Sequence, residues 1–489
     1  MMHLDRDVCD RARLARDPRF DGLFFIGVKS TGIYCRPICP ARPPRPENIV
    51  YYPTAAAAAA AGLRPCLRCR PETAPGTPAW NGTAASVSRA MHLIRQGALN
   101  DGSVDQLADR LGLSSRHLRR LFRKHIGATP KAIADHQRLL FAKKLVMETD
   151  MPITQAALAS GYGSLRRFNA AFRKGLGRTP SRMRSSRSQP QPVAASGARC
   201  ILDLSYRPPY DWDRMLAFFQ RRAIPGVEHV ANGTYRRTVR LGSGQGEIAV
   251  RHATRGFGLR LEICLTDDRD LMVVVERVKR MFDLDANPRA IHSTLCHDPL
   301  LGRLIRQTPG LRLSGSWDPF ETAVRAVIGQ QISIKGAVTQ MGRLVRQAGR
   351  PYDSAQDVHL THFFPRAAEL ADMGWTGIGM PGARKTTLRR LAEKAASGAL
   401  SLQGTAGLPA FIDAMTQIRG IGEWTANYIA MRALGEPDAF PASDLGILKA
   451  LQEGPDRPTG KQAGARAENW RPWRAYACMY LWHSLEEAG

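Results

Sequence analysis

The densest group of potential metal ligands in the sequence is a set of four cysteines near its beginning. They stand in "YCRPICPARPP" and "RPCLRCRP", with the spacing C-x3-C and then C-x2-C. Four thiolates suit a tetrahedral Zn²⁺ site, and a short segment with few core residues gains folding free energy from such a metal. Two chemistries fit this set: a structural knuckle, or a reactive thiolate held by the metal. The four residues are Cys35, Cys39, Cys66 and Cys69.

A second group of candidate functional residues lies near the C-terminal end, in "IRGIGEWTANYIA" and "FPASDLGILKAL". Gly420 and Gly422 bracket Ile421 before an expected helix. A glycine turn at a helix start presents free backbone N–H groups, which suit one DNA phosphate. Asp444 stands at the start of another expected helix. Its carboxylate fits an N-cap and also a charge facing a cleft, and the two roles are compatible.

The charge of the chain indicates a polyanionic partner. The 489 residues include 70 Lys and Arg against 43 Asp and Glu, a net charge of +27, and residues 1–200 alone hold 33 against 13. A basic field of this kind attracts nucleic acid, although a merely solvated basic face is the plainer alternative. With 44% hydrophobic residues the chain is globular, and its length fits roughly three domains.

Nothing in the sequence points to a membrane or to secretion. No run of about 18 apolar residues is present, and the alanine tract 55–61 is too short for a span. The N-terminal residues are partly acidic and lack an apolar core, unlike a signal peptide. We therefore expect a cytoplasmic protein, in which clustered cysteines favour metal binding over disulfides.

The middle of the chain contains an internal repeat. "LADRLGLSSRHLRRLFRKHIGATP" (107–130) and "ALASGYGSLRRFNAAFRKGLGRTP" (157–180) each predict a helix, a glycine turn and a basic amphipathic helix. The turn glycine is Gly112 in the first unit and Gly161 or Gly163 in the second. Two such units in tandem resemble the double helix-turn-helix of AraC-type regulators, although a helical spacer is the alternative. The outward arginines expected at DNA are Arg116, Arg119, Arg120, Arg166 and Arg167.

The chain divides into five predicted segments of a multidomain, mostly helical α+β protein. Strand-like alternation followed by a helix predicts a small antiparallel sheet after the polar linker, and helices with short turns follow it. The predicted segments are a small zinc-bound α/β domain (1–75), the double helix-turn-helix (80–184), a linker (185–199), the sheet domain (200–285) and a helical domain (286–489), which the resemblance described below implies is a helix-hairpin-helix glycosylase domain.

The cysteine segment resembles the N-terminal domain of Ada-type DNA repair regulators, through "VKSTGIYCRPICPARPP" and "GLRPCLRCRP". The resemblance implies that Cys35 is both a zinc ligand and the acceptor of a methyl group from a DNA methylphosphotriester. Methylation would lower the negative charge of the cluster and raise DNA affinity. Arg36, Arg42 and Arg45 are expected at flanking phosphates. The family's second active site, Pro-Cys-His-Arg, is absent.

Most of residues 201–489 resembles the AlkA-type 3-methyladenine DNA glycosylase II branch of the helix-hairpin-helix superfamily. The resemblance rests on "YRPPYDW", "DPFETAVRAVIGQQIS", "GIGEWTANYIAMRALG" and "RPWRAYACMYLWH". It implies that Asp444 is the catalytic aspartate, which stabilises an oxocarbenium-like sugar. Trp424, Tyr428 and Trp482 match positions that line the base pocket, where aromatic faces attract cationic alkylated bases.

Three positions distinguish this chain within the superfamily. Trp424 occupies the place of the Schiff-base lysine of bifunctional members, so a monofunctional glycosylase is expected. Arg419 replaces the usual hairpin proline before "GIG". Gln331, in "GQQIS", occupies the position of the leucine wedge that enters the DNA gap.

The sequence thus predicts a two-lesion DNA repair protein that is also a transcription activator. Its expected cofactor is zinc, and its expected partners are alkylated and promoter double-stranded DNA and RNA polymerase, with the chain acting as a monomer. Two rivals fit the sequence less well. The retained Asp444 and Trp424 argue against a DNA-binding regulator whose glycosylase-like half is inactive, and the context "TGIYCRPICPARPP" argues against a zinc-finger protein with structural cysteines only.

Overall fold

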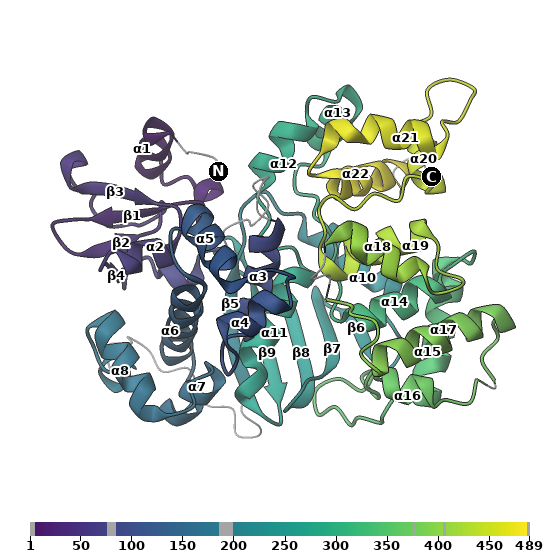
Figure 1. Cartoon of the computed structure of the whole chain (residues 1–489), viewed down its shortest axis with the longest axis horizontal. Coiled ribbons are helices and arrows are strands. Elements are labelled where there is room, and N and C mark those ends of the chain that lie inside the picture. The colour runs from purple at the N-terminus through teal and green to yellow at the C-terminus, as the bar shows by residue number, and fades with distance from the viewer. Residues whose placement is uncertain (1–4, 76–84, 185–198, 376, 404–406, 487–489) are drawn as a thin grey trace.

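The computed structural model describes residues 5–75, 85–184, 199–375, 377–403 and 407–486. Helices are the predominant elements, and the strands form two separate sheets (Figure 1). The expected linker 185–198 lies outside the described residues, and Arg199, placed in that linker from sequence, already begins a strand. Among the helices that the structure describes, none combines the length and apolarity needed to cross a bilayer.

Residues 5–75 form a small four-stranded sheet with order β3-β1-β2-β4 (Figure 1). All pairs are antiparallel except β2 with β4. Only two small apolar clusters, around Phe24 and around Tyr34, support this sheet. So small a core makes a stabilising metal physically reasonable. The elements are α1 (Arg6–Leu14), β1 (Phe25–Val28), β2 (Ile33–Cys35), β3 (Ile49–Tyr52), α2 (Ala55–Ala60) and β4 (Arg64–Pro65).

The predicted double helix-turn-helix is confirmed. Each unit has a short first helix, a left-handed glycine and a recognition helix that begins at a serine N-cap and ends at another left-handed glycine. The turn glycine of the second unit is Gly161, whose φ is +79°. The units comprise α4 (Val104–Asp109) with α5 (Ser115–Ile126), and α7 (Ile153–Ala159) with α8 (Leu165–Leu176). They are accompanied by α3 (Ala85–Arg95), α6 (Pro130–Glu148) and α9 (Pro180–Arg184).

The second sheet is antiparallel throughout, with order β5-β9-β8-β7-β6, as the alternating sequence predicts. Its core residues form one cluster with those of α10 and α11 and with those of the helix-turn-helix half. The elements are β5 (Arg199–Ser205), α10 (Trp212–Arg222), β6 (Glu228–Ala231), β7 (Thr234–Arg240), β8 (Gln245–His252), β9 (Gly258–Leu265) and α11 (Leu271–Met281).

The remaining residues form a helical bundle around α14 (Pro319–Ile328), in which eight of ten residues are buried. The helix α19 (Glu423–Ile429) runs on into a π-helical segment, Ala430–Leu434. The other helices are α12 (Pro288–Leu295), α13 (Pro299–Gln307), α15 (Ile334–Ala348), α16 (Ala367–Ala371), α17 (Gly382–Ala396), α18 (Leu408–Thr416), α20 (Leu445–Ala450), α21 (Gly460–Ala467) and α22 (Arg474–Glu486).

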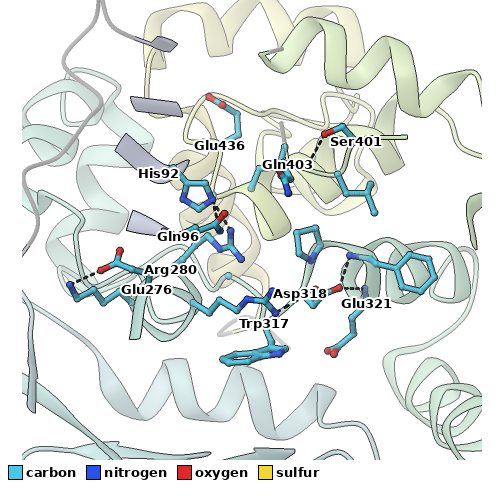
Figure 2. A pocket seen from close by; sticks show the side chains of 18 of the residues that line it. His92, Gln96, Glu276, Arg280, Trp317, Asp318, Glu321, Ser401, Gln403 and Glu436 are labelled. Atoms are coloured by element: carbon cyan, nitrogen blue, oxygen red, sulfur yellow. Dashed lines mark hydrogen bonds and ion pairs between the residues drawn. The ribbon is translucent and has the colours of Figure 1, made fainter. Parts of the chain in front are cut away.

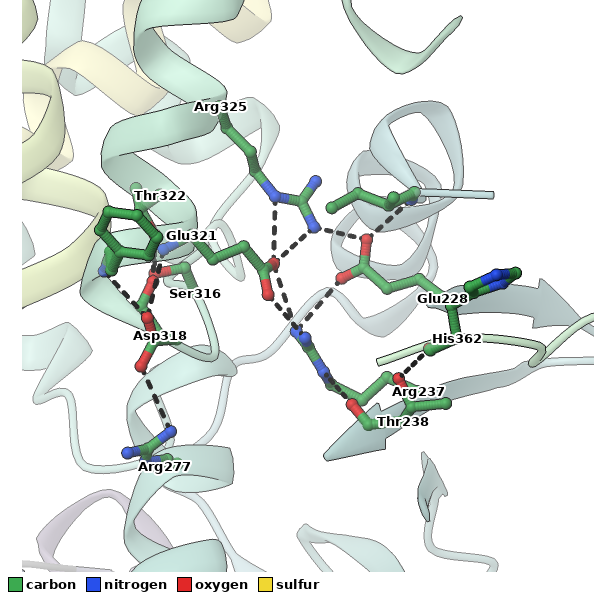
Figure 3. A network of polar contacts seen from close by, with 12 residues as sticks. Glu228, Arg237, Thr238, Arg277, Ser316, Asp318, Glu321, Thr322, Arg325 and His362 are labelled. Atoms are coloured by element: carbon green, nitrogen blue, oxygen red, sulfur yellow. Dashed lines mark hydrogen bonds and ion pairs between the residues drawn. The ribbon is translucent and has the colours of Figure 1, made fainter. Parts of the chain in front are cut away.

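A buried ionic network joins the second sheet to this bundle (Figure 3). Arg237 of β7 pairs with Glu321 of α14 at 2.7 Å and with Glu228 of β6 at 3.4 Å. Arg325 bonds to the same two carboxylates at 2.8 and 2.5 Å. Burial alone raises the pKa of Glu321, but the two arginines outweigh it and lower that pKa to about 2. The carboxylate therefore stays ionised and fixes the sheet against α14.

The helix-turn-helix half and the second sheet share one hydrophobic core, which runs from α6 to α9 into β5–β9. Polar contacts reinforce this junction. Lys143 of α6 bonds to the buried Glu72 at 2.6 Å, and the adjacent Lys144 donates to the carbonyl of Asp203 at 2.6 Å. Because α6 contacts Glu72 of the N-terminal segment and Asp203 of β5, it links the segment that holds the first sheet to the second sheet.

Arg207 is a second fully buried cation at this junction, with 0% exposure like Lys143. Its guanidinium donates to the carbonyls of Asp21 (2.8 Å) and Pro75 (3.2 Å) on one side. On the other side it donates to the carbonyls of Asp285 (2.7 Å) and Ala286 (3.1 Å). A single side chain thus bonds to the backbone of the N-terminal segment (5–75) and to the backbone that precedes α12 in the C-terminal half.

A cavity of about 680 Å³ lies between α3 and the C-terminal half (Figure 2). At its wall, His92 accepts a hydrogen bond from Arg280 at 3.2 Å. Burial, aided by nearby arginines, lowers the pKa of His92 to about 3, so the neutral ring can act as acceptor. None of the residues predicted to be catalytic lines this cavity.

We expect Arg207→Ala to lower the free energy of unfolding by about 3–5 kcal/mol, because four buried carbonyls lose their donor. Urea unfolding monitored by circular dichroism measures the change. Arg303→Ala, an exposed arginine on α13, is the matched control and should change stability by less than about 0.5 kcal/mol. Equal stability of the two variants would contradict the role assigned to Arg207.

Candidate functional sites

The four predicted cysteines come together at the end of the first sheet. The pairing of β2 with β4 places Cys35 beside the chain that leads to Cys66, whose N–H donates to the Tyr34 carbonyl at 3.0 Å. All four sulfur atoms lie within 4.8 Å of one another. Cys66 and Cys69 are buried, whereas Cys35 and Cys39 are partly exposed. Four converging thiols fit a tetrahedral zinc ion.

The backbone around the cluster supports the sulfur atoms. The N–H of Arg36 donates to Sγ of Cys69 at 3.3 Å. The N–H of Cys39 donates to the Arg36 carbonyl at 3.1 Å, and the N–H of Arg70 donates to the Cys66 carbonyl at 3.2 Å. Such outer contacts orient ligands before a metal binds.

The side chain of Arg36 does not lie where the sequence analysis expected it. It is 7% exposed, forms a close two-armed ion pair with Asp21, and bonds to the carbonyl of Cys69 at 3.2 Å. The guanidinium therefore faces the interior, because a carboxylate fifteen residues earlier is folded against it. Arg42 and Arg45, the other two arginines expected at phosphates, are exposed.

The carboxylate of Asp444 is held by three N–H donors. Its Oδ1 accepts from the backbone N–H of Ile447 at 3.0 Å, which makes it the N-cap of α20, as one reading predicted. The same oxygen accepts from Trp482 Nε1 at 2.8 Å, and Oδ2 accepts from Trp424 Nε1 at 2.9 Å. Asp444 is thus both an N-cap and a fixed charge between two indoles.

The predicted pocket aromatics lie together beside this carboxylate. The rings of Trp424 and Tyr428 stack at 5.5 Å with an interplanar angle of 12°, and Tyr428 lies 6.3 Å from Trp482. These three side chains and Asp444 line a cavity of about 650 Å³. Burial raises the pKa of the nearby Cys478 thiol well above its usual value. Its thiol stays neutral, and the negative charge here belongs to Asp444.

The cavity also contains residues that the sequence analysis missed. Arg432, in the π-helical segment, is 5% exposed, and its guanidinium carbon lies 4.6 Å from the ring centre of Phe218 and 5.3 Å from that of Trp482. Ile332 and Ile334 line the cavity although they are 39% and 44% exposed. The sequence shows only an Ile-Ser-Ile run at this place, and the exposure of the two isoleucines is visible only in the structure.

Gln331 precedes these isoleucines in an exposed turn with a φ of +57°. Gly420 and Gly422 are exposed in the turn before α19. At Gly420 the φ is +98° and an added Cβ would lie 2.1 Å from Thr387 Oγ1, so only glycine fits. Gly422 is the N-cap of α19 and offers no side-chain cap, which leaves N–H groups of the first turn open.

The predicted outward arginines lie on the two recognition helices. All are exposed, while the apolar sides of α5 and α8 pack inward through Phe122, Phe168 and Phe172. The exposed set is Arg116, Arg119 and Arg120 on α5, and Arg166 and Arg167 on α8.

Three family profiles match separate parts of the chain. The metal-binding domain of Ada matches residues 8–72, a helix-turn-helix domain matches 107–186, and the AlkA N-terminal domain matches 201–318. Together with the cysteine cluster, these define a zinc-binding, DNA-binding protein joined to a glycosylase-like half.

The chain is similar over nearly its whole length to the "Probable bifunctional transcriptional activator/DNA repair enzyme AlkA" of Mycobacterium tuberculosis. The two are 40% identical over 486 residues, which cover 99% of this chain and 97% of that protein. The chain therefore belongs to this family of bifunctional proteins, in which an Ada–AraC-type regulator is fused to an AlkA-type glycosylase.

Two further likenesses concern the C-terminal half. The DNA-3-methyladenine glycosylase 2 of Escherichia coli is 31% identical over 281 residues, 58% of this chain and 96% of that protein. The structure of a 3-methyladenine DNA glycosylase from Archaeoglobus fulgidus superimposes with a TM-score of 0.50 at 22% identity, covering 57% of this chain and 96% of that one. The fold of this half is that of the helix-hairpin-helix glycosylases.

We expect Cys66→Ala to weaken the near-ultraviolet thiolate-to-metal charge-transfer band of the Co²⁺-loaded protein, because one of the four thiolate ligands is lost. The same variant should lower the melting temperature, since the small first sheet loses a metal ligand. Cys264→Ala, outside the cluster, is the control and should keep the band. An unchanged band in Cys66→Ala would remove Cys66 from the ligand set.

Proposed function

We propose that this protein repairs alkylated DNA through two separate reactions and activates transcription in response. The observation on which the proposal chiefly rests is the carboxylate of Asp444, fixed by two indole N–H groups at the wall of an aromatic cavity. The domain limits predicted from the sequence remain our proposal for how these activities are divided along the chain.

The C-terminal half acts as a monofunctional glycosylase on alkylated bases such as 3-methyladenine. The lesion leaves the base stack and enters the cavity, where Trp424, Tyr428 and Trp482 offer ring faces to a cationic base. As the N-glycosidic bond breaks, positive charge develops on the deoxyribose, and Asp444 stabilises it. The bonding electron pair leaves with the base and neutralises its positive charge, and water then adds its hydroxyl to the sugar carbon and releases its proton to solvent. Trp424 provides no amine, so no imine forms.

DNA positioning in this half follows from the exposed turns near the cavity. Gly420 and Gly422 present backbone N–H groups to one phosphate. Gln331, with Ile332 beside it, occupies the gap that the flipped nucleotide leaves. The exposed apolar side chain of Ile332 adds the contact that glutamine alone would provide poorly.

The N-terminal half accepts one methyl group from a DNA methylphosphotriester. A bond forms between Cys35 Sγ and the methyl carbon, the methyl–oxygen bond breaks, and its electron pair stays on the phosphate as a diester oxygen. Bound zinc supplies deprotonated thiolates at neutral pH. Cys35 is partly exposed at the end of β2, which suits an attack on a bulky backbone.

Methylation of Cys35 converts an anionic sulfur into a neutral thioether and so reduces repulsion of DNA phosphates. Arg42 and Arg45 then contact flanking phosphates, and the arginines of α5 and α8 bind promoter DNA. The methylated protein recruits RNA polymerase as a monomer in the cytoplasm. The rival, a regulator with an inactive C-terminal half, is disfavoured because the donors around Asp444 are intact.

We expect Asp444→Asn to reduce release of 3-methyladenine from methylated duplex DNA by at least about 100-fold, because the developing positive charge loses its counter-charge. Chromatography of the free base measures it. The amide oxygen of Asn still caps α20, so DNA affinity should be unchanged, but one indole N–H loses its acceptor and the melting temperature should fall slightly. Asp298→Asn is a matched control: it too is an N-cap bonded to an indole, but it lies outside the cavity. Excision that persists in Asp444→Asn would exclude the proposed role.

We expect Cys35→Ala to prevent methyl uptake from DNA that contains methylphosphotriesters, because the acceptor sulfur is gone. Intact-mass spectrometry and peptide mapping measure it. Cys296→Ala, which removes an exposed cysteine outside the cluster, should still gain one methyl group on Cys35. Methyl groups found on another cysteine would overturn the assignment.

A further inference from the structure

A second group of metal-binding side chains lies on the outer edge of the second sheet. His229, Asp357 and His359 each offer one ligand atom, and these atoms lie within 4.8 Å of one another. In the described part of the chain, this group and the four cysteines are the two places where at least three His, Cys, Asp or Glu ligands converge so closely. The histidine group lies far from the cysteines in sequence and belongs to a different sheet.

Two rigid pieces of backbone place these side chains. His229 lies on β6, the edge strand, and neighbours Glu228, whose side chain turns inward to the buried ionic network. Alternation along a strand therefore directs His229 to the opposite face. The other two residues flank a turn in which the N–H of Leu360 donates to the Asp357 carbonyl at 3.0 Å.

The turn is fixed at its base. The N–H groups of Thr361 and His362 both donate to the Gly226 carbonyl, at 2.8 and 2.9 Å. The hydroxyl of Thr238 donates to the His362 carbonyl at 2.8 Å. Because strand and turn are joined by these bonds, the three ligand side chains are held near one another before any ion binds, which favours binding.

The contacts within the group leave ligand capacity free. Asp357 Oδ2 lies 2.7 Å from His229 Nδ1, and Asp357 Oδ1 accepts from the backbone N–H of His359 at 3.0 Å. The two imidazole centres are 4.1 Å apart. The ring nitrogens of His359 have no hydrogen-bond partner among the described residues. Arg236 lies 3.8 Å from Asp357 and is 30% exposed, so its long side chain can turn to solvent.

We propose that His229, Asp357 and His359 form a second metal site, for a borderline divalent ion such as Zn²⁺. Two imidazoles and one carboxylate are a ligand set for zinc, nickel or cobalt, whereas Ca²⁺ and Mg²⁺ prefer oxygen ligands alone. In a tetrahedral site, ligand atoms about 2.0–2.1 Å from the ion lie about 3.3 Å apart. Here Asp357 Oδ2 and His229 Nδ1 lie 2.7 Å apart and all three ligand atoms lie within 4.8 Å of one another, so side-chain rotations without backbone movement can reach that geometry. The exposure of His359 leaves a fourth position to water.

The bound ion clamps the segment 351–365 to β6. That segment pairs through Leu360 with Gly226, just before the edge strand β6, and leads into α16 of the bundle. A metal at this place therefore stabilises the attachment of the sheet to the bundle. It takes no part in the reactions proposed above, and the inference does not depend on them.

The test is the metal content of the full-length protein after removal of all metal by a chelator, reloading with Co²⁺ and gel filtration. We expect about two ions per chain for the unaltered protein and about one for His359→Ala and for Asp357→Asn. In every variant the thiolate charge-transfer band reports the cysteine site separately, because imidazole and carboxylate ligands give no such band. His362→Ala, three residues from His359 but outside the group, is the matched control and should keep about two ions.

One outcome would overturn the proposal directly: a single ion per chain in the unaltered protein with a full charge-transfer band. The His229–Asp357 contact would then be only a hydrogen bond that attaches the turn. Two ions retained in both His359→Ala and Asp357→Asn would equally remove these residues from the site. Loss of one ion with the charge-transfer band intact would support it.

Discussion

The arrangement of the two halves depends on the burial of one guanidinium, that of Arg207. Its donors bind the backbone carbonyls of Asp21, which precedes β1, and of Pro75 on one side, and those of the segment before α12 on the other. A buried arginine is tolerated only where its N–H groups are paired, and separating the halves would leave both the cation and the carbonyls unpaired. The shared apolar core from α6 to β9 also holds the two halves together. The regulator and the glycosylase half are thus joined as one packed structure.

This junction begins close to the cysteine cluster. Arg36, the residue after Cys35, pairs with the side chain of Asp21, and the carbonyl of Asp21 accepts from Arg207. Because the Arg36–Asp21 pair is close to neutral as a unit, it does little to offset the negative charge of the thiolates. The charge that a DNA backbone meets at this end therefore comes from the cluster itself and from exposed arginines such as Arg42. A change in the charge of the cluster would therefore change the electrostatic potential at the DNA-facing surface, because the Arg36–Asp21 pair does little to offset it.

Local patterns in the sequence predicted the helices and strands well, but they did not predict contacts between residues that are distant in the sequence. The spacing of the cysteines, the repeated helix-turn-helix units and the alternating strands each depend on neighbours in sequence. The burial of Arg36 was not predictable, because its partner Asp21 is brought to it only by the fold. For Trp424 and Trp482, the sequence indicated ring faces for a base. Their indole N–H groups, which bind Asp444, depend on the meeting of α19, α20 and α22.

The donors around Asp444 determine what the carboxylate can still do. A carboxylate offers about four acceptor positions on its two oxygens, and three are taken by Ile447, Trp482 and Trp424. These donors fix the orientation of the carboxylate, since neither oxygen can rotate without losing an indole. One acceptor position remains, on Oδ2, the oxygen that has a single partner. That position is where a water molecule or the polarised sugar would find negative charge. A carboxylate bound by fewer donors would be free to turn away, and one bound by four would have no acceptor left for the reacting group.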